Sequence, residues 1–523
     1  MKTMLRVSSI TLLLLFLFPA SGLAVTITSA ASGNWNAGTT WVGGVVPLAT
    51  DSAVIATGHT VTLTVATTIT KLTVNTGGTV AVGIQTLAVS GSLTVNGTIS
   101  GTGAITLSGA GTIIDGTGSL THTGTVTITA AKTIASTANL TFSGTVAVTG
   151  AITVTNNGTI TIAGAGGITG SVAGSTWLNG VNSTLNIAGP LLATGTLTAT
   201  ANPNTVNYNS TTIAQTVKTT TYHHLTITKA AQTATLAAAT TLNGNLTIAS
   251  GILNTATFTL GVAGNFTDNG TLSGTGVVTL SGTGTTIDGI GAITNTAVFT
   301  ISTGAKTIAS TANLTFSGTV AVTGAITVTN NGTVTVSAAG GITGSVAGST
   351  WLNGVNSSLI ISGPLLATGT LTATANPNTI NYNGAAAQTV KASTYFNLTT
   401  SGAGAKTLGG AITVSGALNL SAGSFADGGF IATVAGNLTN NVAHTGLGRI
   451  ALSGGTAAHV VSGTGSITNI ELNDVNGATL ISNVTINGAL TFTSGTITTG
   501  VNSVILSATG SVVRTSGHVV GNF

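Results

Sequence analysis

A long block of this chain occurs twice, and that repeat constrains the fold more than any other feature. Residues 132–209 recur almost unchanged as residues 306–383, an offset of 306 − 132 = 174. Both copies consist of short stretches in which Thr alternates with Val, Ile or Leu, separated by Asn-Gly and Gly corners. Asn-Gly corners also occur in hairpins, but near-continuous short strands without helical spacers favour a coil of stacked strands. The sequence therefore predicts an all-β fold, a right-handed parallel β-helix (β-solenoid).

The differences between the two copies predict which side chains face inward. Ile160 and Ile162 of the first copy are valines in the second, whereas Thr159 and Thr161 are kept. Side chains two residues apart share one face of a strand, so we expect the aliphatic pair to face the core and the threonines to face solvent. Asn186 is replaced by isoleucine in the second copy, which indicates a tolerant outer position.

Composition supports strands and excludes several classes of function. Only 3% of the residues are charged, against about 25% in average soluble domains. Thr, Val and Ile favour strands, and Gly and Asn supply corners. Cysteine is absent, which removes disulfides and thiolate metal sites. The few lysines and arginines form no cluster of the kind that nucleic-acid binding needs, so we expect no nucleic-acid partner.

The first residues predict export. Lys2 and Arg6 precede an apolar stretch, Ile10 to Phe18, and small residues follow up to Ala24. This order is typical of a secretory signal peptide, here 1–24, and the stretch is short for a membrane span. We therefore expect no transmembrane segment after cleavage.

The rest of the chain divides by its repeats. We expect a capping segment at 25–65, because a solenoid end left open exposes a strand edge. Solenoid then follows at 66–131, 132–230 (copy 1), 231–305, 306–400 (copy 2) and 401–523, the last expected to be truncated.

The capping segment carries a family resemblance. It reads G-x-W, then T-W-x-G-G-x-x-P-x-x-x-D, then V-I-x-x-G-H-x-V-T-L. These motif positions are Gly33, Trp35, Thr40, Trp41, Gly43, Gly44, Pro47, Asp51, Val54, Ile55, Gly58, His59, Val61, Thr62 and Leu63. In this pattern and in its strand repeats the chain resembles bacterial secreted β-strand-repeat proteins. The resemblance implies an adhesin-like parallel β-helix that is secreted and lies at the cell surface of a bacterium.

Acidic residues offer little catalytic chemistry. Glycoside hydrolysis needs two carboxylates about 5–10 Å apart, and only Glu471 and Asp474 are close in the mature sequence. Asp115 and Asp288 occupy matching Ile-Asp-Gly strings, which are typical of turns. We therefore expect no enzyme and no catalytic residue. A polysaccharide-degrading β-helix enzyme stays an alternative, because coils can bring distant acids together.

Histidine gives no metal site by pattern. Tyr222-His223-His224 is the only paired histidine string, and neighbouring residues of a strand face opposite sides. The matching residues of the other copy are Tyr395, Phe396 and Asn397, so a metal site here would be absent from its own duplicate. We expect no metal and no cofactor.

The outer surface suggests three kinds of contact. Thr-x-Thr pairs would form an ice-binding array if they stacked in register, but they do not recur at one fixed sequence spacing, which argues against an uninterrupted array. A Thr- and Asn-rich face also suits surface glycans or other copies of the chain. The residues proposed for glycan contact or capping are Trp35, Trp41, Asp51, His59, Trp177 and Trp351.

Together these features predict an exported, extracellular, structural or adhesin-like β-solenoid without catalytic activity. Duplicating a block adds length and repeated surface rather than a new catalytic site, which suits multivalent binding.

Overall fold

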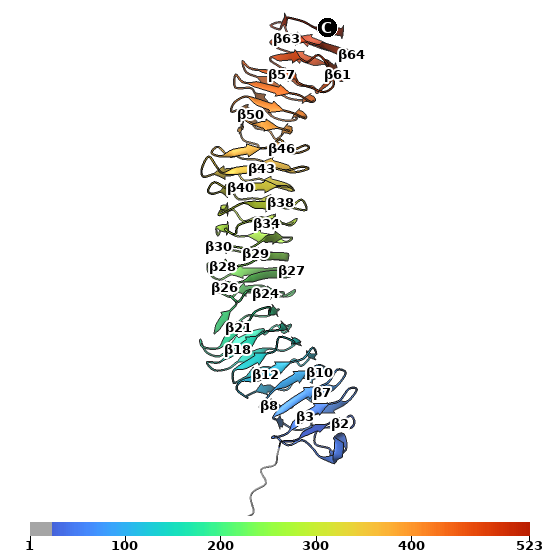
Figure 1. The fold of residues 1–523 in the computed structure, drawn as a ribbon, viewed down its shortest axis with the longest axis vertical. Helices are drawn as coiled ribbons and strands as arrows, with labels where there is room; N and C mark the ends of the chain where they lie inside the picture. The colour runs from blue at the N-terminus through green and yellow to red at the C-terminus, as the bar shows by residue number, and fades with distance from the viewer. Residues whose placement is uncertain (1–23) are drawn as a thin grey trace, which may run out of the picture.

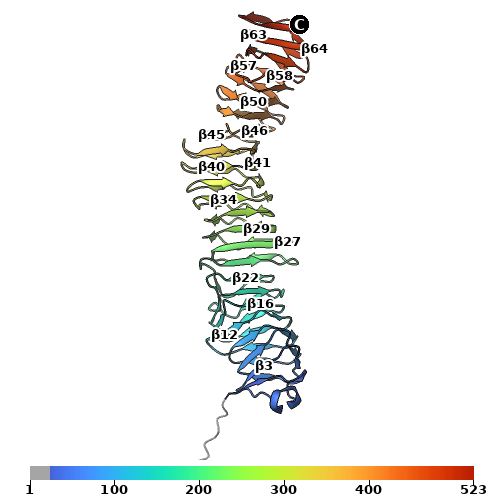
Figure 2. The ribbon, with the colours of Figure 1, turned by 45° about the vertical axis from the view of Figure 1, so that its right-hand side comes forward.

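The chain folds into a long β-solenoid. The computed structural model describes residues 24–523, so the predicted signal peptide lies outside the described residues except for Ala24. About 24 turns stack one on another into a curved rod, with the first and last coils at its opposite ends (Figures 1 and 2). Every pairing between the strands is parallel, and the only helical elements in the described part are two short 3₁₀ turns. The predicted all-β, parallel β-solenoid is confirmed.

Most coils contribute three short strands, one to each of three walls. In one coil these are β6 (Lys71–Val74), β7 (Thr79–Gly83) and β8 (Leu87–Val89). The next coil places β9 (Leu93–Val95) on β6 and continues around the same three walls. Backbone groups of one coil are therefore satisfied by the next, as in any parallel ladder.

The three walls are named A, B and C for the first half of the rod. Wall A contains β1 (Thr26–Thr28), β3 (Ser52–Ile55), β6, β9, β12 (Thr112–Asp115), β15 (Lys132–Ile134), β18 (Thr153–Asn156), β21 (Thr176–Asn179) and β23 (Thr196–Thr198). Wall B contains β4 (Thr60–Thr62), β7, β10 (Thr98–Gly101), β13 (Ser119–Leu120), β16 (Asn139–Phe142), β19 (Thr159–Ile162), β22 (Thr184–Ile187), β24 (Thr205–Tyr208), the first parts of β27 (His224–Leu236) and β29 (Leu246–Asn254), and β31 (Phe266–Asp268). The second parts of β27 and β29 lie on the next wall, where β27 pairs with β25. Wall C contains β5 (Thr67–Ile69), β8, β11 (Ile105–Leu107), β14 (Val126–Ile128), β17 (Val146–Val148) and β20 (Ile168–Gly170).

The predicted division into inner and outer faces is confirmed. Ile160 and Ile162 on β19 are completely buried, whereas Thr159 and Thr161 are half-buried on the outer face. Asn186 also lies on the outer face, as the copy comparison indicated. The inward residues of successive coils form one continuous apolar core along the rod.

Buried asparagines stabilise the corners between walls A and B. Asn156 accepts a hydrogen bond from the Gly158 N–H through its Oδ1 atom at 3.1 Å, the turn that short amide side chains favour. Its Nδ2 atom donates to the Oδ1 atom of Asn179 one coil further on, at 3.2 Å. The second copy repeats the turn, with Asn330 accepting from Gly332 at 3.1 Å.

Several inward positions hold lysine instead of an aliphatic residue. Lys306 is almost completely buried, and its ammonium group donates to the carbonyl oxygens of Ser302 and Thr303 at 2.9 and 3.1 Å. Lys406 likewise donates to Gly384 O at 2.9 Å. Burial lowers the pKa of both lysines, because a buried charge loses its hydration. The hydrogen-bond partners of their ammonium groups are backbone carbonyls rather than acids.

The N-terminal coil is irregular. The 3₁₀ turns η1 (Gly38–Thr40) and η2 (Val42–Gly44) follow each other, and Trp41 forms an antiparallel bridge with Ser29 after β1. Gly43 has a φ of 75°, which glycine adopts without strain. The role of 25–65 as a cap stays a prediction.

Asp268 occupies a corner position that asparagine holds elsewhere. Its Oδ1 atom accepts from the Gly270 N–H at 3.0 Å, the same turn that Asn156 makes with Gly158. The side chain is completely buried, and its Oδ2 atom has no hydrogen-bond partner. Burial raises the pKa of Asp268 from its ordinary value of 3.8 to about 7, against the opposing effect of backbone N–H donors.

We predict that Asp268→Asn stabilises the protein at alkaline pH. An acid whose folded pKa is raised contributes stability below its unfolded pKa, and that contribution is lost as the pH rises through about 7. The variant should therefore raise the free energy of unfolding by about 2 kcal/mol at pH 8 and change it little at pH 4. Urea denaturation at both pH values measures this. Asp288→Asn, at a half-buried carboxylate one coil further on, is the control, and an equal gain there at pH 8 would contradict the explanation.

Candidate functional site

The two tryptophans of the N-terminal coil pack against each other. The ring centroids of Trp35 and Trp41 lie 4.9 Å apart at an interplanar angle of 71°. Only 3% and 2% of these residues are exposed. The Trp41 Nε1–H donates to the Trp35 carbonyl oxygen at 2.6 Å. The pair fills the end of the core and leaves no ring face open to a sugar.

The tryptophans of the two copies are buried in the same way. Trp177 and Trp351 are each 1% exposed and lie on the inner face of wall A in copy 1 and of the matching wall in copy 2. Their Nε1–H groups donate to Asn179 and Asn353 at 3.0 Å. A buried indole that is already hydrogen-bonded acts as a core residue rather than as a stacking platform.

Asp51 and His59 connect the first coils. The Asp51 carboxylate accepts from the backbone N–H groups of Val25 at 3.2 Å and Leu48 at 2.8 Å. The His59 Nδ1 atom lies 2.9 Å from the Ser29 hydroxyl. The same hydroxyl accepts a hydrogen bond from the Ala56 N–H, directly after β3. Asp51 therefore connects Leu48 to the residue before β1, and His59 connects to Ser29 at the end of β1.

Asp115 and Asp288, which the sequence predicted to lie in turns, each accept a hydrogen bond from the glycine that follows. Asp115 Oδ1 accepts from its neighbour Gly116 N–H at 2.7 Å and from the Thr137 hydroxyl at 2.8 Å. Asp288 makes the same two kinds of contact with its own glycine and with Thr311.

Glu471 and Asp474, which are close in sequence, have separate partners. Glu471 on β60 (Ile470–Asn473) pairs with the Arg449 guanidinium at 2.5 Å and accepts from the Thr493 hydroxyl. Burial alone would raise its pKa, but these hydrogen bonds lower it overall. Asp474 lies in the following corner and pairs with His459 at 3.1 Å. Each carboxylate is engaged in its own structural contact.

The paired histidines correct one expectation. His223 lies in the corner between β26 (Thr221–Tyr222) and β27, so His223 and His224 are not successive residues of one strand. Their ring centroids are 4.2 Å apart at an interplanar angle of 68°, so the two side chains do not face opposite sides of a strand. His224 Nδ1 accepts from the Asn245 N–H at 2.8 Å. Within residues 24–523 no group of three or more potential metal-ligating side chains lies together.

Wall B carries an unbroken column of neutral polar side chains. Successive coils place a Thr, Ser or Asn at the same register on its outer face, although the sequence spacing varies. We name this set the hydroxyl–amide column: Thr60, Thr79, Thr98, Ser119, Thr141, Thr161, Asn186, Asn207, Thr226, Thr247 and Thr267. The column is one residue wide, and the Thr-x-Thr pairs do not stack as pairs: Thr62 lies beside Ala81 of the next coil, and Thr161 lies beside Asn186.

Three neighbouring side chains in the middle of the column contact one another from coil to coil. Asn186 Nδ2 donates to the Thr161 hydroxyl at 3.2 Å, and Asn207 Nδ2 donates to Asn186 Oδ1 at 3.1 Å. Parallel stacking spaces equivalent groups by about 4.8 Å. The column thus offers a regular row of neutral donors and acceptors.

Each copy also contains a cleft between two successive coils. In copy 2 the cleft lies between residues 363–367 and residues 386–392 and has a volume of about 690 Å³. In copy 1 it lies between residues 190–193 and 214–219 and measures about 440 Å³. The lining is mostly Pro, Leu, Ala and Thr, and sequence reasoning missed both clefts. The repeated strings Pro-Leu-Leu-Ala and Ala-Gln-Thr-Val-Lys are the signal that marks them.

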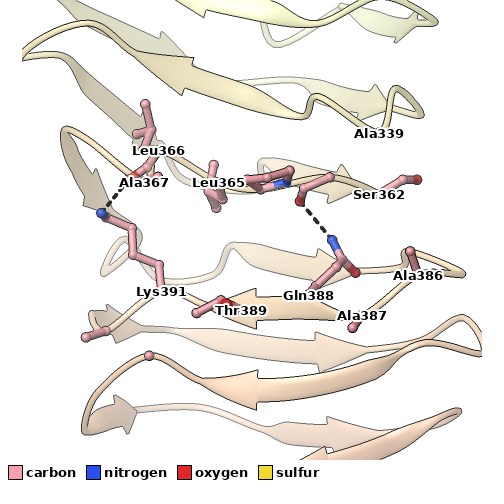
Figure 3. Close-up of a pocket in the computed structure, with 14 residues that line it drawn as sticks. Ala339, Ser362, Leu365, Leu366, Ala367, Ala386, Ala387, Gln388, Thr389 and Lys391 are labelled. Carbon is pink, nitrogen blue, oxygen red and sulfur yellow. Dashed lines mark hydrogen bonds between the residues drawn. The ribbon is translucent and has the colours of Figure 1, made fainter.

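In the copy 2 cleft, one polar side chain at each end bridges the two coils (Figure 3). At one end Gln388 donates through Nε2 to the carbonyl oxygens of Ile361 and Gly363, both at 2.9 Å. At the other end the Lys391 ammonium donates to Leu366 O at 2.6 Å. In copy 1 Gln215 and Lys218 make the equivalent contacts.

We predict that the tryptophan fluorescence of the folded protein is that of buried indoles. Emission should be blue-shifted, and iodide should quench it several-fold less than it quenches the urea-unfolded chain, because all four indoles are at most 3% exposed. Strong quenching of the folded protein by iodide would show that at least one indole is accessible. Trp177→Phe and Trp351→Phe should each remove about a quarter of this protected signal without exposing the rest.

In the described residues, no helix is long and apolar enough to cross a membrane. No protein-family model, no curated protein and no solved structure matches this chain.

Proposed function

We propose that this chain is an exported, non-catalytic extracellular scaffold that binds neutral polysaccharide through the hydroxyl–amide column. The single observation that carries the proposal is the in-register row of eleven neutral polar side chains on wall B. The leader-like residues 1–24 and the resemblance to bacterial secreted β-strand-repeat proteins support export to a bacterial cell surface.

The chemistry of the column suits a neutral polymer. Hydroxyl and amide groups both donate and accept hydrogen bonds, as sugar hydroxyls do. No column residue carries a charge, so binding would not depend on counterions. Weak contacts repeated along a rod add up through multivalency, which long polysaccharides provide. In copy 2 the equivalent outer positions are Thr315, Thr335 and Asn381, with Ile360 in place of Asn186, so the unbroken column is confined to wall B.

The absence of catalysis is part of the proposal. Asp115 and Asp288 stabilise turns, and Glu471 is paired with Arg449. A glycosidase would need a free pair of carboxylates beside a sugar-binding groove.

A second candidate function follows from the same observation. An in-register array of threonine hydroxyl and methyl groups can also order water, so the column favours ice binding as the alternative. The two functions differ in what the array must contact, because ice requires a flat threonine lattice whereas a glycan tolerates the asparagines in the middle of the column.

We predict that charge introduced into the column weakens polysaccharide binding. Thr161→Lys together with Thr247→Lys should reduce the fraction of protein that sediments with insoluble neutral polysaccharides, such as cellulose or chitin, at least several-fold. Thr300→Lys, an equally half-buried outward threonine on another wall, is the matched control and should leave sedimentation unchanged.

The outcomes separate the candidates. No sedimentation of the unmodified protein with any neutral polysaccharide would contradict the proposed function. Thermal hysteresis or reshaped ice crystals, abolished by the column variants, would instead assign the column to ice. Release of reducing sugars from a polysaccharide would contradict the non-catalytic part.

A further inference from the structure

The two clefts mark places where the coil-to-coil ladder is missing on one wall. In copy 2, Leu365 bridges to Ile342 of β42 (Ile342–Gly344) on one side of its coil. On the other side the next strand, β47 (Gln388–Val390), pairs only with β50 (Ala405–Leu408). Within residues 24–523, no backbone hydrogen bond joins residues 363–367 to β47. The side chains of Gln388 and Lys391 bridge the gap instead.

The gap leaves backbone groups free on both of its edges. Pro364 O and Leu366 N–H bond to β42, so the alternation of a parallel strand turns the N–H and C=O of Leu365 toward the cleft. Val390 O accepts from Gly409 N–H on the far side, and the same alternation turns the N–H and C=O of Thr389 toward the cleft. The cleft is therefore bordered by two strand edges that face each other.

Copy 1 has the same arrangement. Leu191 bridges to Ile168, and β25 (Gln215–Val217) pairs only with β27. Leu191 and Thr216 hold the positions of Leu365 and Thr389. Both copies contain the gap and the same two bridging side chains. The gap is therefore part of the repeated structure.

Buried tyrosines fix the lysine at the end of each cleft. The backbone N–H of Lys391 donates to the Tyr382 hydroxyl at 3.1 Å, and the Tyr395 hydroxyl donates to the Lys391 carbonyl oxygen at 2.5 Å. Tyr382 and Tyr395 are completely buried, and their hydroxyls are 3.2 Å apart. The tyrosine pair Tyr208 and Tyr222 holds Lys218 in the same way.

The ammonium group of each cleft lysine keeps hydrogen-bonding capacity. Lys391 uses one donor for Leu366 O, and an ammonium group has three. No Asp or Glu lines either cleft, and none of the ion pairs among the described residues includes Lys218 or Lys391. Burial lowers the pKa of both lysines, so an anion at this position would compensate lost hydration.

We propose that each cleft binds a short extended peptide with small apolar side chains and a free C-terminal carboxylate. The peptide adds a strand between the two coils and pairs with both free edges, as in β-strand addition. Running parallel to its neighbours, like every strand pair of this rod, it ends beside the lysine. Residues 362–366 and 386–391 both run toward Lys391 (Figure 3), so the carboxylate of a parallel peptide meets the ammonium group.

The lining and size agree with this ligand. Pro364 and Ala387 are exposed small apolar residues of the lining, whereas Leu365 is buried, so the apolar contact surface suits small side chains such as Ala or Val. Volumes of about 440 and 690 Å³ lie in the range of about 300–1,000 Å³ that is common for ligand sites. The site is separate from the hydroxyl–amide column and does not rest on the proposed polysaccharide binding.

Fluorescence anisotropy with a labelled peptide tests the proposal on the whole chain. The probe is N-terminally fluorescein-labelled Gly-Val-Ala-Val-Ala, with either a free or an amidated C-terminus. We expect the free carboxylate to bind at least ten-fold more tightly than the amide, with two sites per chain. The double variant Lys218→Met and Lys391→Met should reduce binding of the free acid to the level of the amide. Lys71→Met, at an exposed lysine on β6, is the control and should change nothing.

Hydrogen exchange locates the bound peptide without any variant. The amides of Leu191, Thr216, Leu365 and Thr389 should exchange more slowly when the free-acid peptide is present. No binding of the free acid, equal binding of the amide, or binding without protection of these amides would overturn the proposal. Full displacement of the peptide by octanoate without protection of these amides would also overturn it, because the cleft would then accept aliphatic acids rather than strands.

Discussion

Backbone hydrogen bonding from one coil to the next is the interaction on which the whole rod depends. The chain has no cysteine and only 3% charged residues, so neither disulfides nor ion-pair networks can hold it. Parallel ladders satisfy the backbone of each coil and place equivalent side chains above one another. The apolar core, the buried corner asparagines and the outer polar column all follow from that register.

Register also explains how the interior tolerates polar residues. A buried polar group needs a partner in the same or the neighbouring coil. Asn156 donates to Asn179 one coil away, and Lys406 donates to the carbonyl oxygens of Gly384 and Gly404. Asp268 stands in the asparagine position without a partner for one oxygen, which makes its protonation state part of the stability of that coil.

Alternation along single strands made the fold class and the inner and outer faces predictable from the sequence, as Ile160 and Thr161 show. Contacts between coils were much harder to foresee, because the corners absorb different numbers of residues. Column neighbours are separated by 98 − 79 = 19 residues at one place and by 186 − 161 = 25 at another. A fixed spacing therefore misses the column, and a missing ladder such as the one beside β47 leaves no trace in the pattern of a single strand.

The missing ladders have a mechanical consequence. Backbone hydrogen bonds between coils run along the rod axis, so a pulling force between its ends loads every coil interface in series. Most interfaces resist with three walls of hydrogen bonds. At the two clefts one wall contributes only the side chains of a glutamine and a lysine. Under tension the rod should open first at these two interfaces, so that it extends in discrete steps before any complete coil unravels.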